Sequence, residues 1–150
     1  MQTDIQDRTD SNRWLKVFYK TDTFGNLLGA KAISVSRTEC VYEYEVQNVH
    51  LNPNGILHGG ILFSVMDSCQ GGFIHFFLDP IYKYAATGTA TIRYLKPIQS
   101  GSVRIRSTLK EQKRRRLVIV SHVYDEEGAE IAVLEEIWIA IPKERTDDSV

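Results

Sequence analysis

Cysteine is scarce in this chain of 150 residues, in which only Cys40 and Cys69 occur. Two cysteines are too few for a disulfide framework or a four-ligand zinc site, and the four histidines show neither HxxxH nor HxH spacing. We therefore expect no metal and no cofactor. The low cysteine content also favours a reducing cytosol.

Net charge is close to zero, and long apolar runs are missing. The 18 basic and 19 acidic side chains leave a formal charge of -1, which is too little to favour nucleic acid or an anionic membrane as a partner. No run reaches about 18 apolar residues, and the N-terminus is polar and acidic, unlike a signal peptide. We expect a cytoplasmic protein without nucleic-acid or membrane partners.

Internal repeats, low-complexity tracts and linkers are absent too, so one folding unit is expected. A chain of this length buries about 68–70% of its unfolded surface and needs no staple. A short helix is predicted from Ser11 or Asn12 to about Tyr19, and residues 142–150 are predicted to form a solvated tail. The apolar side of that helix would consist of Trp14, Leu15, Phe18 and Tyr19.

The rest of the sequence combines extended runs with one long apolar helix. Residues 30–35 and 38–47 have β-type patterns, and the alternation in the second run predicts a sheet with one solvated face. Residues 58–78 are mostly apolar and end at Asp79-Pro80, which predicts one buried helix. Four more β-type runs follow, at residues 84–94, 102–110, 117–124 and 130–141. The pattern predicts an α+β fold in which one antiparallel sheet wraps a single helix, and the uncovered side of the helix predicts self-association.

The segment before this helix carries a compact motif. Residues 50–60 read HLNPNGILHGG, and Asp67 follows seven residues later inside the helix. The pattern HxNxxGxxHGG with this aspartate resembles the PaaI-like, phenylacetate-pathway branch of the hotdog-fold acyl-CoA thioesterases. The resemblance covers residues 25–141 and leaves residues 1–24 as an extension. It implies a hotdog fold and hydrolysis of an acyl-CoA thioester to a carboxylic acid and coenzyme A.

Gly59 and Gly60 open the predicted helix, where the first amide N–H groups lack helical partners and the helix dipole is positive. A carbonyl oxygen that gains negative charge is stabilised there, and glycine lets a substrate approach the backbone. We therefore expect Gly60 to take part in catalysis and Gly59 to contact the substrate. The alternative is that both glycines only form a tight strand-to-helix turn.

Asp67 lies among apolar residues of the helix, where a carboxylate is costly to bury unless it is paired or hydrogen-bonded. The resemblance implies that it is the nucleophile or the general base that attacks the thioester, and leaves both roles open. A structural carboxylate that caps a loop or pairs with an arginine is the alternative.

Helix geometry separates Asp67 from the glycine end. His58 and Asp67 are nine residues apart, or about 180° around the helix axis and about 13.5 Å along it. One chain cannot bring both to the same point, so we expect a homodimer with shared active sites, assembled further into a tetramer. The resemblance implies that Asn52, His58 and Gly60 of one chain face Asp67 of the other.

Three polar side chains complete the predicted catalytic set. Asn52 would hold the attacking water or the thioester, although asparagine before proline is also a common turn former. His58 would polarise the thioester or hold the start of the helix. The resemblance implies that Thr87 positions the nucleophile or the water, although threonine is also an ordinary strand residue.

Substrate contacts are expected from a basic run and one aromatic residue. Lys113, Arg114 and Arg115, with Arg116, lie in a predicted hairpin, and clustered basic side chains suit the phosphates of coenzyme A. A merely solvated hairpin is the alternative. Phe63 could line an acyl pocket, with plain core packing as the alternative.

Two other functions fit the same fold. A hotdog 3-hydroxyacyl dehydratase or hydratase would use a histidine and an acid across the same interface. A non-catalytic acyl-CoA-binding domain would bind the thioester without hydrolysing it. The HGG motif followed by a late aspartate matches thioesterases better, so thioester hydrolysis is the leading prediction.

Overall fold

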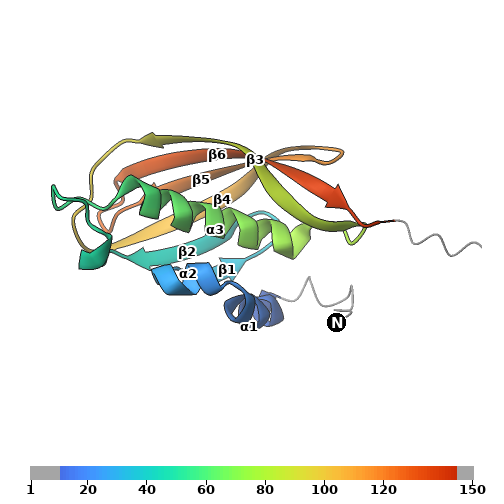
Figure 1. The fold of residues 1–150 in the computed structure, drawn as a ribbon, viewed down its shortest axis with the longest axis horizontal. Helices are drawn as coiled ribbons and strands as arrows, with labels where there is room; N and C mark the ends of the chain where they lie inside the picture. The colour runs from blue at the N-terminus through green and yellow to red at the C-terminus, as the bar shows by residue number, and fades with distance from the viewer. Residues whose placement is uncertain (1–10, 145–150) are drawn as a thin grey trace, which may run out of the picture.

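One antiparallel sheet of six strands carries a long helix on one face in the computed structural model, which describes residues 11–144 (Figure 1). The helices are α1 (Ser11–Thr21), α2 (Thr23–Leu28) and α3 (Gly59–Phe77), with a short 3-10 turn at Asn48–His50. The strands are β1 (Lys31–Val35), β2 (Cys40–Glu45), β3 (Tyr82–Tyr94), β4 (Ser102–Lys113), β5 (Arg116–Tyr124) and β6 (Glu130–Pro142). The predicted α+β fold, with one sheet around one central helix and a short N-terminal helix, is confirmed.

The strand order is β1-β2-β4-β5-β6-β3, and every neighbouring pair is antiparallel. This order makes β3 an edge strand, because it pairs with β6 on one side only. Its 13 residues run along this edge of the sheet beside α3, and residues 86–91 are exposed. A long edge strand therefore borders the helix along much of its length.

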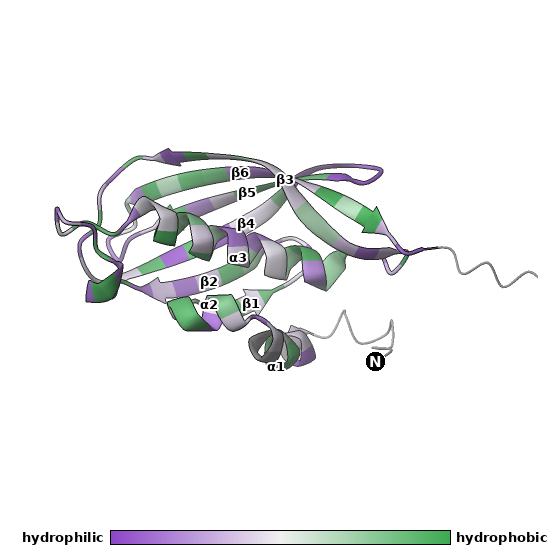
Figure 2. Ribbon diagram, viewed as in Figure 1, coloured by the Kyte–Doolittle hydropathy of each residue, from purple (hydrophilic) through white to green (hydrophobic). Residues whose placement is uncertain are grey.

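Burial explains why α3 lies where it does. Val65, Met66, Cys69 and Phe73 are fully buried against the sheet. The strands supply the other half of the core, because β2 buries Cys40, Tyr42 and Tyr44 while the residues between them turn outward. Figure 2 shows apolar residues along the strands that run beneath α3. None of the described helices is long and apolar enough to cross a membrane.

The N-terminal region holds one helix more than the sequence pattern predicts. Helix α1 begins at Ser11, as predicted, and its Trp14 is buried. The side chains of Phe18 and Tyr19 lie outside the described part of the chain. Residues 145–150 of the predicted tail also lie outside it. The unpredicted helix is α2, which Asp22 caps by accepting a hydrogen bond from the Gly25 amide at 2.8 Å. Gly29 ends it at a φ of 83°. Six residues are too few for a helical period to stand out.

A buried polar network ties α3 to the sheet. Gln70 is fully buried, and its Nε2 donates to Ser121 Oγ at 2.9 Å and to the Leu134 carbonyl at 3.3 Å. Its Oε1 accepts from Trp138 Nε1 at 2.9 Å. All polar atoms of this side chain are thus paired within the protein, which sets the rotation of α3 over β5 and β6.

Gln70→Leu should destabilise the fold by about 2–4 kcal/mol, because it leaves the buried Trp138 indole N–H without an acceptor and removes the hydrogen bonds to Ser121 and Leu134. Urea denaturation of the variant measures the loss. Gln112→Leu, an exposed position on β4, is the matched control and should change little. Equal stability of the two variants would contradict a structural role for the network.

Candidate active site

Asp67 lies in the middle of α3 and faces β6 and β3, the two strands at one edge of the sheet. It is half-buried, and its Oδ1 accepts a hydrogen bond from Thr87 Oγ1 of β3 at 3.2 Å. Thr87 pairs with Trp138 of β6 in the sheet. The structure thus brings together Asp67 and Thr87, two residues of the expected catalytic set that are 20 positions apart.

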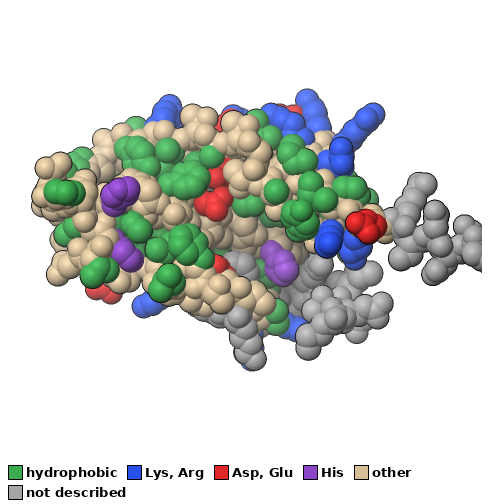
Figure 3. Space-filling model, viewed as in Figure 1, with side chains coloured by type: hydrophobic (Ala, Val, Ile, Leu, Met, Phe, Trp, Pro, Cys, Tyr) green, Lys and Arg blue, Asp and Glu red, His purple; other side chains and the backbone are tan. Residues whose placement is uncertain are grey.

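Burial sets the protonation behaviour of Asp67. Desolvation raises the pKa of this carboxyl above its usual value, hydrogen bonds from Glu136 and Thr87 lower it, and the nearby charge of Asp22 raises it. The net result is a raised pKa, so Asp67 is a stronger base than an exposed aspartate. In Figure 3, acidic atoms reach the surface near the middle of the face that α3 occupies, bordered by hydrophobic side chains.

Glu136 of β6 is a neighbour of Asp67 that the motif does not indicate. It is fully buried, and it occupies the inward face of β6 together with Leu134 and Trp138. The available signal was its position in the strand alternation, which places a carboxyl where the neighbouring inward residues are apolar.

The N-terminus of α3 is capped by its own histidine. His58 is exposed, and its Nδ1 accepts from the Gly60 amide at 2.9 Å. The Gly60 N–H is therefore occupied by His58, whereas the Gly59 amide has no acceptor within residues 11–144. A carbonyl oxygen can reach the Gly60 N–H only when the His58 ring turns away.

Tyr94, the last residue of β3, covers this end of the helix. Its hydroxyl donates to the Gly59 carbonyl at 2.7 Å. A Cβ on Gly59 would lie 3.0 Å from the Tyr94 ring and hydroxyl, so any larger residue here would have to displace the Tyr94 side chain. A cavity of about 300 Å³ opens beside the two residues, with Leu57, Leu62 and Ile98 among its lining.

The loop before α3 uses its polar side chains internally. Asn52 Oδ1 accepts from the amides of Asn54 at 2.9 Å and Ile56 at 3.2 Å, which closes the Pro-Asn-Gly turn. His50 Nδ1 contacts the Tyr44 hydroxyl at 2.5 Å. Within one chain, the side chain of Asn52 thus shapes the loop and makes no contact with Asp67.

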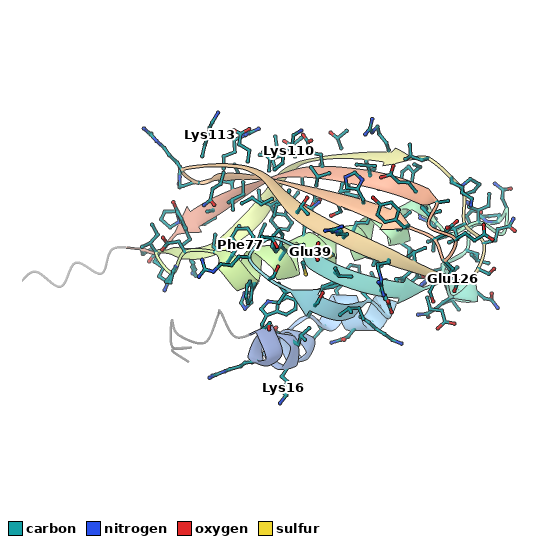
Figure 4. All side chains as sticks on the ribbon, turned by 180° about the vertical axis from the view of Figure 1, so that it is seen from behind. Lys16, Glu39, Phe77, Lys110, Lys113 and Glu126 are labelled. Atoms are coloured by element: carbon teal, nitrogen blue, oxygen red, sulfur yellow. The ribbon has the colours of Figure 1, made fainter. Side chains whose placement is uncertain are left out.

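The basic hairpin joins β4 and β5 through Arg114 and Arg115. Lys113 and these two arginines are exposed, and Arg114 has a φ of 50°, the one positive φ of a non-glycine residue among those described. The amide of Ala140 donates to the Arg115 carbonyl at 2.7 Å. Figure 4 shows Lys113 toward the same end of the molecule as Phe77, the last residue of α3. The hairpin therefore lies at the opposite end from Gly59.

Phe63 is partly buried and packs against the core on α3. In a single chain, the predicted residues thus form two groups, one around Asp67 and one around the start of α3. No group of three or more potential metal ligands is gathered within residues 11–144.

The comparisons with known proteins agree with this architecture. The profile of the thioesterase superfamily matches residues 54–132, which is more than half of the chain. No curated protein sequence matches the chain.

Three solved structures illustrate the fold. The E. coli PaaI protein from the phenylacetic acid degradation operon is 20% identical, with a TM-score of 0.76 over 84% of this chain and 89% of that one. A thioesterase from Pseudomonas aeruginosa, solved as a mutant, is 18% identical, with a TM-score of 0.80 over 86% and 94%. The phenylacetic acid degradation protein PaaI from Thermus thermophilus, also solved as a mutant, is 25% identical, with a TM-score of 0.72 over 79% and 98%. The chain therefore belongs to the thioesterase superfamily, and its fold is the hotdog fold of these PaaI proteins.

Proposed function

We propose that this protein hydrolyses acyl-CoA thioesters to free carboxylic acids and coenzyme A, with Asp67 as nucleophile or general base. The observation that carries the proposal is the half-buried Asp67 carboxylate held by Thr87 beside an edge strand, with its pKa raised by desolvation. Membership of the thioesterase superfamily supports the reaction class.

As a general base, Asp67 takes a proton from water while the water oxygen bonds to the thioester carbon. The C–S bond then breaks, and the proton passes to the departing thiolate. As a nucleophile, the Asp67 carboxylate bonds to the thioester carbon and expels the coenzyme A thiolate. Water then hydrolyses the mixed anhydride, which releases the carboxylic acid, restores Asp67 and supplies the proton that the thiolate takes up. In both routes the Thr87 hydroxyl helps to orient the carboxylate by donating to its Oδ1 at 3.2 Å.

The carbonyl oxygen gains negative charge in both routes and needs donors. The free Gly59 amide, and the Gly60 amide once His58 turns away, supply them at the positive end of α3. Asp67 lies eight residues along the same helix, or about 12 Å away. The donors that serve Asp67 therefore come from a second copy of the chain in this proposal.

The exposed edge of β3 is the proposed dimer interface, since it offers unpaired N–H and C=O groups. Antiparallel pairing of two copies about a two-fold axis at Thr91, with the bulged Gly88 left unpaired, would set Thr87 opposite the partner subunit's Tyr94. Thr87 contacts Asp67, and Tyr94 contacts Gly59. The same pairing would therefore bring each acid to the other helix start and create two equivalent sites. Two such dimers would form the proposed tetramer.

The basic hairpin is the proposed contact for coenzyme A phosphates. The hairpin is exposed. Arg115 accepts a hydrogen bond from Ala140, which lies two residues after Trp138, the strand partner of Thr87. The hairpin is therefore at the Asp67 side of the sheet rather than at the Gly59 end. Figure 3 shows Lys and Arg side chains gathered at the corresponding end of the molecule. We propose the cytoplasm as the place of action, where acyl-CoA would be the partner.

A panel of acyl-CoAs with short, medium, long and aromatic chains tests the function. We expect release of free thiol from at least one of them, detected with a thiol reagent. A 3-hydroxyacyl-CoA that loses water without thiol release would instead indicate a dehydratase. Thermal stabilisation by acyl-CoAs without any turnover would indicate a binding domain.

A further inference from the structure

Glu136 is a buried carboxyl without a conventional partner. Its side chain is fully buried, and neither carboxyl oxygen has a hydrogen-bond donor within residues 11–144. No salt bridge among the described residues joins Glu136 or Asp67 to a basic side chain. Burial of a carboxylate in this way is very costly, whereas a protonated carboxyl is tolerated.

The polar group that Glu136 meets is Asp67. Two contacts bring α3 against this part of β6. Thr87, which pairs with Trp138, donates to Asp67, and the Trp138 indole donates to Gln70, less than one turn further along α3. Gln70 bonds to Leu134 and Trp138, the two inward residues that flank Glu136 on β6, so the Glu136 carboxyl lies under the turn of α3 that carries Asp67. Two carboxylates are both acceptors, so such a contact needs a proton on one of them.

We propose that Glu136 carries this proton and donates it in a hydrogen bond to the Asp67 carboxylate, so that Glu136 is a positioning residue for the reaction. This inference rests on the proposed thioesterase function. With Thr87 holding one oxygen of Asp67, the bond from Glu136 fixes the orientation of the carboxylate and keeps it ionised.

The electrostatics agree with this assignment. Burial, the negative charge of Asp67 and the hydrogen bond to Asp67 raise the pKa of Glu136 to about 8, although the nearby Trp138 indole acts to lower it. The hydrogen bonds from Glu136 and Thr87 lower the pKa of Asp67, which burial nevertheless keeps above its usual value. Asp22 adds a weaker negative charge, and the sheet neighbours of Glu136, Ala90 and Ile119, carry none. At neutral pH the proton therefore resides on Glu136.

The proposal predicts a bell-shaped pH profile for kcat. Activity rises with pH as Asp67 loses its proton, and it falls as Glu136 ionises around pH 8, when two buried carboxylates repel each other. The two limbs belong to the pair as a whole, so a change at Glu136 should alter the pH profile beyond the ionisation of Glu136 itself.

Two substitutions separate hydrogen bonding from ionisation. Glu136→Gln keeps a donor but cannot ionise, so kcat at pH 7 should stay within about threefold of the wild type and the alkaline limb should disappear. Glu136→Met removes the donor as well, so kcat should fall about 10- to 100-fold with KM little changed, and the acidic limb should move to higher pH. Glu135→Gln, the adjacent position paired with Lys110, is the matched control and should keep the wild-type profile.

Infrared spectroscopy supplies a readout that does not depend on turnover. The wild type should show the C=O band of a protonated carboxyl at pH 7, and the band should be missing from Glu136→Gln but present in Glu135→Gln. In Asp67→Asn the band should titrate at lower pH, because the charge that raises the pKa of Glu136 is gone.

Absence of the band in the wild type, or an unchanged titration in Asp67→Asn, would overturn the proposal. A wild-type profile in Glu136→Met would overturn the positioning role. If the wild type releases no thiol from any acyl-CoA, the thioesterase assignment fails, and the infrared titration still decides whether the protonated pair exists.

Discussion

Asp67→Asn should lower kcat for acyl-CoA hydrolysis by about 10²- to 10⁴-fold, because asparagine keeps the shape of the side chain but can neither accept a proton from water nor attack a carbonyl. The Thr87 hydroxyl still has an oxygen to bind, so the geometry around α3 should persist. Initial rates of thiol release under saturating substrate measure the effect.

The Asp67→Asn substitution should not lower the stability of the fold. Because desolvation raises the pKa of Asp67, the ionised form costs stability above the ordinary pKa of an aspartate, and a neutral amide removes that cost. Thermal unfolding at pH 7 should therefore give a Tm no lower than that of the wild type. Asp79→Asn, the same replacement at an exposed position after α3, is the matched control and should leave kcat unchanged. Near wild-type turnover by Asp67→Asn would remove Asp67 from the mechanism.

The second large expected effect is that mixing two inactive variant chains restores acyl-CoA hydrolysis. Asp67→Asn and Asn52→Ala chains should each be nearly inactive, whereas refolding them together should restore about one quarter of the wild-type activity. In a shared-site dimer, half of the randomly formed dimers contain both chains, and each of those has one intact site out of two. Asn52→Ala also loosens the turn that the Asn52 side chain closes, which damages the same site.

Placing both substitutions on one chain gives the control for this experiment. A double-variant chain paired with a wild-type chain has no complete site, because each site lacks one of the two residues. After mixing, the total activity should fall below that of the same amount of wild-type protein alone. Purified heterodimers of the two single variants that remain inactive would argue against a shared site.

The sequence predicts the fold well where the physical signal is long. The 19 residues of α3 and the strands of the sheet follow hydrophobic patterns that span many residues, and the elements differ from expectation only by small shifts at their ends. Helix α2 was missed because its signal lies in two residues, the cap at Asp22 and the left-handed Gly29. Such a signal is common in loops and has no period to support it.

Only some residues of the candidate site could be predicted from the sequence. Thr87 was identified through the family resemblance, and the structure adds its contact with Asp67. Tyr94 and Glu136 could not be assigned roles from the sequence, because their importance depends on which strands border α3. That depends on the strand order, in which β3 follows α3 in the chain but pairs with the last strand, β6.

In the proposed dimer, strand β3 would combine two roles in one short segment. From residue 85 to residue 91 it reads AATGTAT, so that small side chains alone occupy the border where a neighbouring polypeptide would lie, while one of its threonines holds Asp67. A bulky replacement here would push two polypeptides apart and loosen the reactive carboxylate at once. Substitutions in this segment would therefore affect both assembly and turnover. We expect the segment to change more slowly over evolution than its exposure alone would suggest.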